Sequence, residues 1–407
     1  MAHDPAACPA ALHMSRRRWS SRRVVAMALT VAVWMTTGVG VYLYLSAHRS
    51  TFDQAARKPD EANLNARNSP LGHLPGTLYL VQAGTLYRLQ QGTFTAVLNS
   101  PGGAAGWTQP AFLPHGQGLV VARRDYAYSD LYLIDREGKV QSQLTHNANT
   151  TVELNHWAFY PRLSPDGGSL FFSYDPKDRF NDYNVVFAVW SMPMNSGFEQ
   201  ARKWTSPEHF TGGDIQPAPL PSGALIYTKY TFDGKSSRIL GQIYLTTSPG
   251  AVGESLTAPE DDCSQPAVSP DGQRLAMICT RGRQLANIEI ASFDGRQLGP
   301  RQVLVADQLA TQPTWAPDGE SLVYLAPEGV GGHFQLWQEQ VPAASSPSAA
   351  APTPLVTTPA TPPPGAIVGR PTVTPTLAVP TPTPAPQPFP LTSKLDFDPT
   401  STIAWHA

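Results

Sequence analysis

The stretch QPAVSPDGQRLAM, residues 265–277, decides the fold because variants of it recur along the chain. The related stretches are QPAFLPHGQGLVV from Gln109, YPRLSPDGGSLFF from Tyr160, QPAPLPSGALIY from Gln216 and QPTWAPDGESLVY from Gln312. These five copies start 51, 56, 49 and 47 residues apart, and a degenerate copy, KLDFDPTSTIAW, starts at Lys394. A repeat of about 50 residues is typical of β-propeller blades.

Each copy predicts a β-hairpin. The proline presets φ for a type I turn, and the glycine supplies the positive φ of a bulge, which gives a three-residue loop between two strands. A third apolar strand follows, as at Leu131–Ile134, and a fourth often ends in a pair such as Leu144-Thr145. Four short strands in each unit predict an all-β, six-bladed β-propeller.

The sixth blade has to be assembled from both ends of the chain. Residues 76–98 read as the later strands of a blade without a preceding Pro-x-Gly hairpin, and residues 395–399 read as a hairpin with nothing after it. Joining them closes the ring. Residues 77–81 and 402–405 both match the second strand of this blade, and the sequence leaves open which one takes that place.

The hairpins resemble those of the TolB-like, or PD40 (WD40-like), propeller repeats. The best matches are Ser164–Gly167, Ser269–Gly272 and Ala316–Gly319, and the resemblance covers residues 75–341 and 389–407. It implies the propeller fold and a setting in the bacterial envelope. It implies little about function, because propellers of this family bind many different molecules.

The N-terminal region predicts a membrane anchor. Val24–Leu45 holds 22 residues without a charge, which as a helix would span roughly 33 Å. Five arginines precede it, so we expect residues 1–23 to form a basic cytoplasmic tail, 46–74 a linker, and the propeller to lie outside the cytoplasm. A cleaved signal peptide is the alternative, although such apolar regions normally run about 7–15 residues.

Residues 342–388 interrupt the last repeat between its third and fourth strands. They are rich in proline and threonine and carry too few apolar side chains to form a core, which predicts a disordered insert. A glycosylated or wall-spanning stalk is the functional alternative. Residues 389–407 would then supply the strands that close the propeller.

The sequence offers no sign of catalysis. It contains no G-x-S-x-G, H-E-x-x-H, C-x-x-C or P-loop motif, and its formal net charge of −2 gives no reason to expect a nucleic acid partner. We therefore assign no catalytic, cofactor-binding or metal-binding residue and no cofactor. The Pro-Asp-Gly aspartates are assigned to turn formation.

Cys263 and Cys279 form a candidate disulfide. Counting outward from a three-residue Pro270–Gly272 loop places the two cysteines opposite each other at a hydrogen-bonded pair, within reach of a disulfide. Two buried free thiols are the alternative.

The loops between the second and third strands form the candidate binding surface. They share aromatic and charged residues, the types that carry binding energy at interfaces. The candidates are Arg123, Arg124, Tyr126, Tyr128, Asp130, Asp175, Arg179, Tyr183, Tyr230 and Arg281. The alternative is a solvated set of loops with ordinary turn chemistry.

These observations together predict a membrane-anchored binding scaffold whose partner is another envelope protein or a glycan. The sensory ectodomain of a membrane signalling system is one alternative. A propeller enzyme acting on sugars or peptides is the other, and it would show a cluster of carboxylates or metal ligands at the mouth of the channel.

Overall fold

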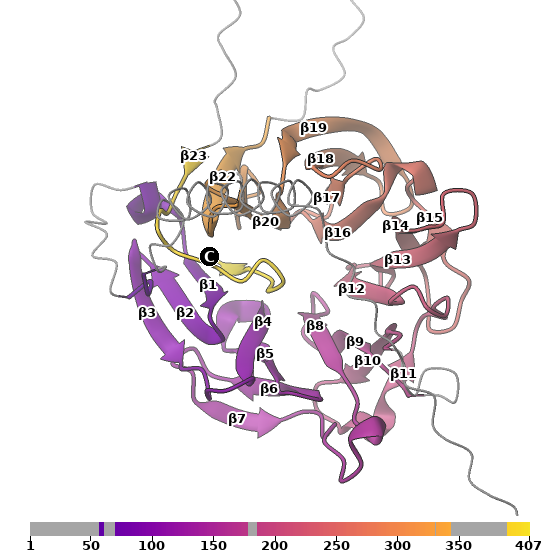
Figure 1. Ribbon diagram of the computed structural model, residues 1–407, viewed down its shortest axis with the longest axis horizontal. Helices are drawn as coiled ribbons and strands as arrows, with labels where there is room; N and C mark the ends of the chain where they lie inside the picture. Colours follow the sequence, from indigo (N-terminus) through magenta and orange to yellow (C-terminus); the bar gives the residue numbers. More distant parts are fainter. Residues whose placement is uncertain (1–56, 61–69, 178–184, 330, 343–388) are drawn as a thin grey trace, which may run out of the picture. The chain divides into compact units, whose positions relative to one another are not determined.

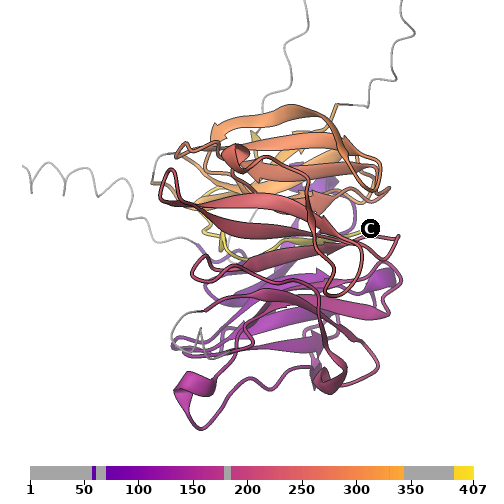
Figure 2. The same cartoon turned by 90° about the vertical axis from the view of Figure 1, so that its right-hand side faces the viewer.

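The computed structural model describes residues 57–60, 70–177, 185–329, 331–342 and 389–407. From residue 70 onward they form six four-stranded antiparallel sheets arranged as blades around a central channel (Figure 1). Figure 2 shows the same ring from its side. Helical structure among these residues is limited to the short 3-10 turns η2 (Pro70–His73), η3 (Pro114–Gly116), η4 (Val152–Leu154), η5 (Phe198–Gln200) and η6 (Pro259–Asp261). The prediction of an all-β, six-bladed propeller is confirmed.

Each blade runs from an innermost strand at the channel to an outermost strand at the rim. In this order, blade 1 holds β24 (Ala404–His406), β1 (Thr77–Gln82), β2 (Thr85–Gln90) and β3 (Thr93–Leu98). Blade 2 holds β4 (Gly106–Phe112), β5 (Leu119–Arg124), β6 (Ser129–Ile134) and β7 (Val140–Gln143). Blade 3 holds β8 (Ala158–Leu163), β9 (Ser169–Tyr174), β10 (Ala188–Pro193) and β11 (Arg202–Lys203).

The second half of the ring follows the same plan. Blade 4 holds β12 (Asp214–Pro219), β13 (Leu225–Asp233), β14 (Arg238–Thr246) and β15 (Glu254–Ser255). Blade 5 holds β16 (Cys263–Val268), β17 (Arg274–Cys279), β18 (Ala286–Phe293) and β19 (Leu298–Gln308). Blade 6 holds β20 (Thr311–Trp315), β21 (Ser321–Pro327), β22 (Phe334–Gln340) and β23 (Phe389–Pro390).

The core lies between neighbouring blades. Val120 and Leu131 of blade 2, for example, are fully buried in one cluster with Leu170 and Phe172 of blade 3. Full burial of an apolar side chain of this size contributes about 1.5–3 kcal/mol, so the ring depends on every blade having a packed neighbour. Successive side chains of the middle strands point to opposite faces of the sheet, so their apolar residues supply these contacts on both faces.

The repeated Gln-Pro pair forms a β-bulge in the innermost strand. In blade 5 the register of β16 against β17 shifts between Ser264 and Ala267, so that Gln265 and Pro266 occupy the irregularity. Gln265 has a φ of 56°, in the left-handed region. Blades 2, 3, 4 and 6 repeat the shift, and the residues at the equivalent position are Gln109, Tyr160, Gln216 and Gln312, all with φ between 53° and 57°. Proline suits this position because it has no backbone N–H to donate, and a bulge interrupts the hydrogen-bond ladder at this point.

The glutamines of these bulges tie adjacent blades together. The side-chain carbonyl of Gln109 accepts the backbone N–H of Tyr160 at 2.6 Å, and that of Gln265 accepts the N–H of Gln312 at 2.6 Å. The N–H of Gln265 in turn donates to the side chain of Gln216 at 3.0 Å. Each glutamine side chain therefore accepts a backbone N–H of the next blade. That N–H lies at a bulge, where the β-ladder of the blade offers it no partner. We call this chain of contacts the glutamine belt.

The hairpin loops are longer than predicted in four blades. In blade 5 the N–H of Ser269 donates to the carbonyl of Arg274 at 2.9 Å, which leaves four residues in the loop rather than three. Only blade 4, where Leu220 bonds Ala224, has the expected three. The glycine does take a positive φ, as at Gly272 with 72°. The predicted loop was one residue too short because the residue after the glycine also belongs to the loop and not to the second strand.

The closure of the ring settles the open question about the terminal strands. β24, from the C-terminal end, is the innermost strand of blade 1, and β1 is the second strand beside it, with Tyr79 opposite Ala404. The reading of residues 395–399 as the hairpin of this blade is wrong. Asp398 and Pro399 lie in the loop that leads into β24, and the Asp398 carboxylate accepts the N–H of Thr400 at 2.9 Å.

Two predicted segments fall largely outside the described residues. β22 and β23 are neighbours in one sheet, with Trp337 opposite Pro390, so the proline-rich insert connects the third and fourth strands of blade 6. Residues 343–388 of the insert and the expected anchor at Val24–Leu45 are not described. Within the described ranges, no helix has both the length and the hydropathy that a membrane crossing requires.

Candidate functional site

One face of the ring carries two sets of loops. They are the loops between second and third strands and the loops that lead into the innermost strands, since alternate strands run in opposite directions. The Pro-x-Gly hairpins lie on the opposite face for the same reason. We call the first of these the pocket face, because it contains a large cavity at the mouth of the channel.

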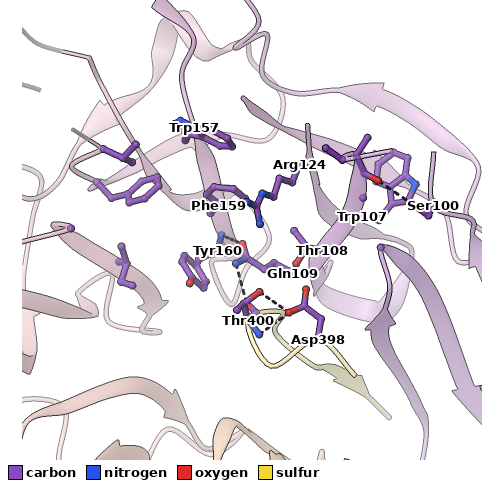
Figure 3. A pocket seen from close by; sticks show the side chains of 18 of the residues that line it. Ser100, Trp107, Thr108, Gln109, Arg124, Trp157, Phe159, Tyr160, Asp398 and Thr400 are labelled. Carbon is purple, nitrogen blue, oxygen red and sulfur yellow. Dashed lines mark hydrogen bonds between the residues drawn. The ribbon is translucent and has the colours of Figure 1, made fainter. Parts of the chain in front are cut away.

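The cavity has a volume of about 800 Å³ and lies over blades 1 to 4 (Figure 3). This is within the range of about 300–1,000 Å³ that ligand sites occupy. Its walls are mainly aromatic and small side chains with few charges. The lining includes Gly84, Ser100, Trp107, Thr108, Gln109, Arg124, Trp157, Phe159, Tyr160, Phe187, Ile215, Tyr230, Asp398 and Thr400.

Blade 3 contributes a continuous aromatic wall. The rings of Trp157 and Phe159 stack with centroids 5.7 Å apart and planes 17° apart, and Phe187 meets Phe159 edge-on at 6.0 Å. Trp157, Phe159 and Tyr160 are all only partly buried although they belong to or adjoin the innermost strand. A partly exposed aromatic surface of this kind offers stacking contacts to a ligand at little cost in conformational entropy.

The cavity lining holds two charged residues, Arg124 and Asp398. Arg124, at the end of β5, is exposed and points into the cavity, and none of the carboxylates in the described ranges forms an ion pair with it (Figure 3). Tyr160 lies deeper, where burial raises its pKa to about 12, so that its hydroxyl stays protonated. The arrangement supplies stacking surfaces, one guanidinium and one carboxylate, which is suited to recognition.

The pocket face also carries most of the exposed apolar side chains. Of the twelve large hydrophobic residues that are exposed in the described part of the chain, nine lie on the pocket face. They are Tyr126, Val152, Leu154, Val185, Phe210, Phe232, Ile239, Leu285 and Leu309. Phe210 is 70% exposed. Apolar side chains gathered on one face of a soluble domain mark an interaction surface.

The structure brings two of the candidate residues into the cavity, Arg124 and Tyr230. Arg123 instead lies over the ring of Trp107 at 5.9 Å and pairs with Asp125. Tyr126 is exposed and does not line the cavity. Tyr128, two residues further along the chain, is partly buried.

Two of the candidate aspartates have structural surroundings. Asp130 is buried and accepts hydrogen bonds from the side chains of Gln143 and Thr145, and burial raises its pKa. Asp175 is fully buried, with the ammonium group of Lys177 3.1 Å away, and burial likewise raises its pKa. Arg179 and Tyr183 lie outside the described residues.

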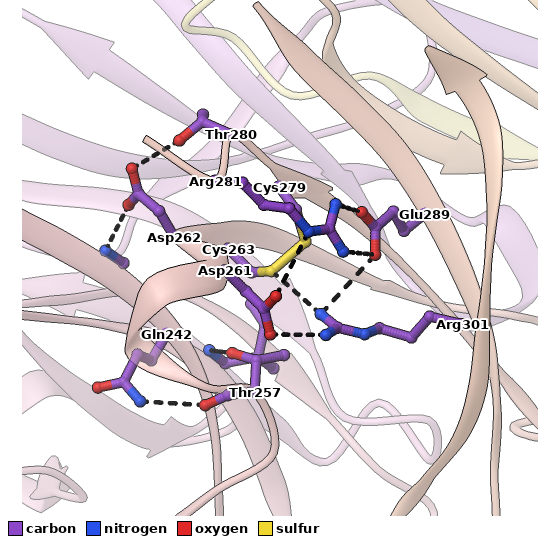
Figure 4. Close-up of a disulfide and its surroundings, with 12 residues drawn as sticks. Gln242, Thr257, Asp261, Asp262, Cys263, Cys279, Thr280, Arg281, Glu289 and Arg301 are labelled. Carbon is purple, nitrogen blue, oxygen red and sulfur yellow. Dashed lines mark hydrogen bonds and ion pairs between the residues drawn. A yellow bond between two sulfur atoms is a disulfide. The ribbon is translucent and has the colours of Figure 1, made fainter. Parts of the chain in front are cut away.

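Arg281 belongs to an ion-pair cluster away from the cavity (Figure 4). It bonds Glu289, which raises the pKa of the Arg281 guanidinium, and its Nε lies 3.5 Å from Asp261. Arg301 donates to Asp261 at 2.6 Å and completes the cluster. The charge of Arg281 is therefore matched within blade 5 and its immediate surroundings.

The same region holds the two cysteines. Cys263 and Cys279 are joined by a disulfide between directly opposite residues of β16 and β17, with Cα atoms 4.1 Å apart (Figure 4). That distance is nearer to a non-hydrogen-bonded pair than to the hydrogen-bonded pair expected from the count. The count placed them opposite each other because the longer loop shifts the register by one residue and the bulge at Gln265 shifts it back.

The sequence reasoning missed the aromatic wall. The signal was available in His156–Tyr160, where aromatic residues precede the proline of the repeat and tyrosine replaces glutamine. The positions of Phe159 hold Thr108, Ile215, Ser264 and Thr311 in the other complete copies. Within the described part of the chain, no group of three or more His, Cys, Asp or Glu side chains is placed to hold a metal ion.

Comparison with known proteins gives a partial match. No protein-family model matches the chain. Among curated proteins it is similar to the TolB homologue of Chlorobium chlorochromatii, with 27% identity over 166 residues, which is 41% of this chain and 32% of that protein. The chain thus matches about a third of the length of this relative.

Solved structures extend the comparison to the fold. TolB from Acinetobacter baumannii superimposes with a TM-score of 0.50 and 20% identity over 65% of this chain and 61% of that one. The putative TolB from Agrobacterium tumefaciens has a TM-score of 0.47 and 16% identity, over 65% of this chain and 84% of that one. The first match agrees with the six-bladed ring, and at such identities it concerns the fold alone.

Proposed function

Because the chain is a TolB-like, PD40-type β-propeller, we propose that it acts as a protein-binding scaffold of the cell envelope and holds its partner on the pocket face. The observation that carries the proposal is the aromatic cavity of about 800 Å³ at the mouth of the channel. Val24–Leu45 would anchor the scaffold in the membrane, with the basic tail in the cytoplasm.

The composition of the pocket face favours a protein partner. The centre of a protein interface typically holds aromatic and arginine residues that fill pockets, surrounded by side chains that exclude water. Here Trp157, Phe159 and Arg124 lie in the cavity, and exposed side chains such as Phe210 and Phe232 lie on the same face. A partner that inserts an apolar or acidic side chain beside Arg124 would fit this arrangement.

Site-specific photo-crosslinking in cells tests the proposal. A photoreactive phenylalanine analogue at Phe210 reports on the pocket face, and the same analogue at Val252, which is 95% exposed between β14 and β15 on the opposite face, is the matched control. We expect one envelope protein to be captured from position 210, not from 252, and to be lost when Phe159→Ala is added. Capture that is equal at both positions, or that ignores Phe159→Ala, would contradict the proposal. Recovery of a glycan in place of a protein would identify the site as glycan-binding.

A further inference from the structure

The middle of the channel contains a charged side chain at a position where the other copies of the repeat have small, uncharged residues. Two residues after the bulge position, the innermost strands of blades 2, 4, 5 and 6 carry small side chains, which are Ala111, Ala218, Ala267 and Thr314. Each of these pairs with the equivalent residue of its second strand, so the positions correspond in space as well. Blade 3 has Arg162 there, opposite Phe171. The channel thus receives one guanidinium where its other walls are uncharged.

Arg162 faces a small cavity on the channel axis. The cavity has a volume of about 20 Å³, and its walls include Tyr160, Arg162, Gln216, Gln265, Gln312, Thr314 and Thr402 with three prolines of the repeat. Burial lowers the pKa of the Arg162 guanidinium to about 10, so it remains protonated at neutral pH. The side chain is partly exposed to the channel, so the guanidinium is only partly desolvated.

Few protein groups contact the guanidinium of Arg162. The guanidinium donates from Nη1 to the carbonyl of Pro161 at 3.2 Å, and a guanidinium has five N–H donors in all. No carboxylate in the described ranges forms an ion pair with it. Arg301 in blade 5 shows the usual solution, with Asp261 at 2.6 Å. A partly desolvated cation without a counter-charge in a narrow channel attracts an anion.

The glutamine belt adds a second kind of donor at the same cavity. The side-chain carbonyl of Gln265 accepts both the N–H of Gln312 at 2.6 Å and the hydroxyl of Thr311 at 3.0 Å. Its amide NH₂ is therefore the part of the side chain left to donate at the cavity, which Gln265 lines. Guanidinium and amide N–H groups that line one cavity whose lining holds no carboxylate form the donor set of an anion site.

We propose that the channel binds one small monovalent inorganic anion of the size of chloride against Arg162. The cavity volume favours this class, because about 20 Å³ holds roughly one water-sized particle. The site lies on the channel axis, below the aromatic cavity that would receive a protein partner, and Tyr160 borders both. The bound anion would neutralise the charge of Arg162 in blade 3 whether or not a protein partner is bound.

Chloride titration of the purified full-length chain tests the site at constant ionic strength. Sodium gluconate, whose anion is too large for the cavity, is replaced stepwise by sodium chloride. We expect the unfolding temperature to rise with chloride and reach a plateau. The same protein should broaden the ³⁵Cl NMR line of the solution, and Arg162→Ala, which restores the residue of blade 5, should weaken chloride binding by roughly 10- to 100-fold.

The controls separate a bound anion from general salt effects. Arg162→Gln keeps a long polar side chain without the charge, so it covers the case in which Arg162→Ala packs badly. Both variants should leave the ³⁵Cl line at the width of free chloride and remove the plateau. Retention of the chloride response in either folded variant, or a natural chain that shows no saturable response, would overturn the proposal.

Discussion

Blades 3 and 5 have the same hairpin and different innermost strands. In both, the serine before the proline donates its hydroxyl to the aspartate of the turn, and the glycine has a φ of 72°. The innermost strand of blade 5 then reads Ser264-Gln265-Pro266-Ala267, whereas that of blade 3 reads Phe159-Tyr160-Pro161-Arg162. In blade 5 the charges of Arg281 and Arg301 are matched by Asp261 and Glu289. Blade 3 leaves aromatic rings and one guanidinium facing the channel.

The contrast separates what the fold needs from what it tolerates. The turn residues are shared because the backbone geometry of the hairpin requires them. The departures in blade 3 serve no such requirement, since blade 5 builds the same sheet without them. We therefore assign the turn and belt residues to stability and the aromatic and arginine residues of blade 3 to binding.

The largest effect should come from the covalent link in blade 5. Replacing both cysteines, Cys263→Ser and Cys279→Ser, removes a cross-link between residues 16 apart in sequence. A loop of this size contributes about 3 kcal/mol to the free energy of unfolding. Urea unfolding of the variant should show a loss of this order. Dithiothreitol should lower the stability of the natural chain toward that of the variant and leave the variant unchanged, and an insensitive natural chain would contradict the assignment.

Removing an arginine should have opposite consequences in the two blades. Arg301→Ala leaves Asp261 without its 2.6 Å partner, although Arg281 remains near, so we expect the free energy of unfolding to fall by about 2 kcal/mol. Arg162→Ala in chloride-free solution should leave it unchanged or raise it, because a cation without a counter-charge is removed. Equal losses in the two variants, measured by urea unfolding, would erase the distinction between the blades.

The glutamine belt gives a smaller and more local contrast. Gln265→Ala removes the acceptor of the Gln312 N–H, so we expect a loss of about 1–2 kcal/mol in the free energy of unfolding. Tyr160→Gln gives blade 3 the residue of the other blades and should cost less. Hydrogen exchange at the Gln312 amide provides the direct measurement, and it should accelerate in Gln265→Ala only. An unchanged exchange rate there would show that the belt does not protect this group.

The smallest effect concerns pH. Hydrogen bonds from the Ser269 hydroxyl and the Gln273 N–H hold the pKa of Asp271 below its usual value of about 3.9, and Asp166 of blade 3 is lowered in the same way. A carboxyl with a depressed folded pKa stabilises the protein above its unfolded pKa, and this contribution disappears as the pH falls through the folded value. Asp271→Asn should therefore flatten the loss of stability below about pH 4, as followed by thermal unfolding. An identical pH profile would contradict this role.

The fold could be predicted from the sequence because its determinants are local and repeated. A proline, a glycine with positive φ and a spacing of about 50 residues define each blade, and they do so five times. The loop lengths and the bulges could not be read from the residues, because each shifts the register by one and the two shifts offset each other. The placement of Cys263 opposite Cys279 therefore came from two errors of opposite sign.

The site was less accessible to sequence reasoning. Of the residues predicted on the loops between second and third strands, Arg124 and Tyr230 reach the cavity. Asp130 and Asp175 could not be distinguished from ligand-binding residues until their burial and their partners were known. Trp157 and Phe159 were overlooked because aromatic residues next to a strand usually belong to the core. Their exposure depends on the channel, which a one-dimensional pattern does not show.

The most direct test measures binding and stability together in one variant of blade 3. Phe159→Ser gives blade 3 the residue that blade 5 has at the equivalent position, Ser264. Crosslinking from Phe210 reports on partner capture, and urea unfolding reports on the fold. We predict that capture is lost while the free energy of unfolding falls by no more than about 1–2 kcal/mol. Retained capture, or a loss of stability of about 4 kcal/mol or more, would show that the aromatic wall belongs to the core and not to a binding site.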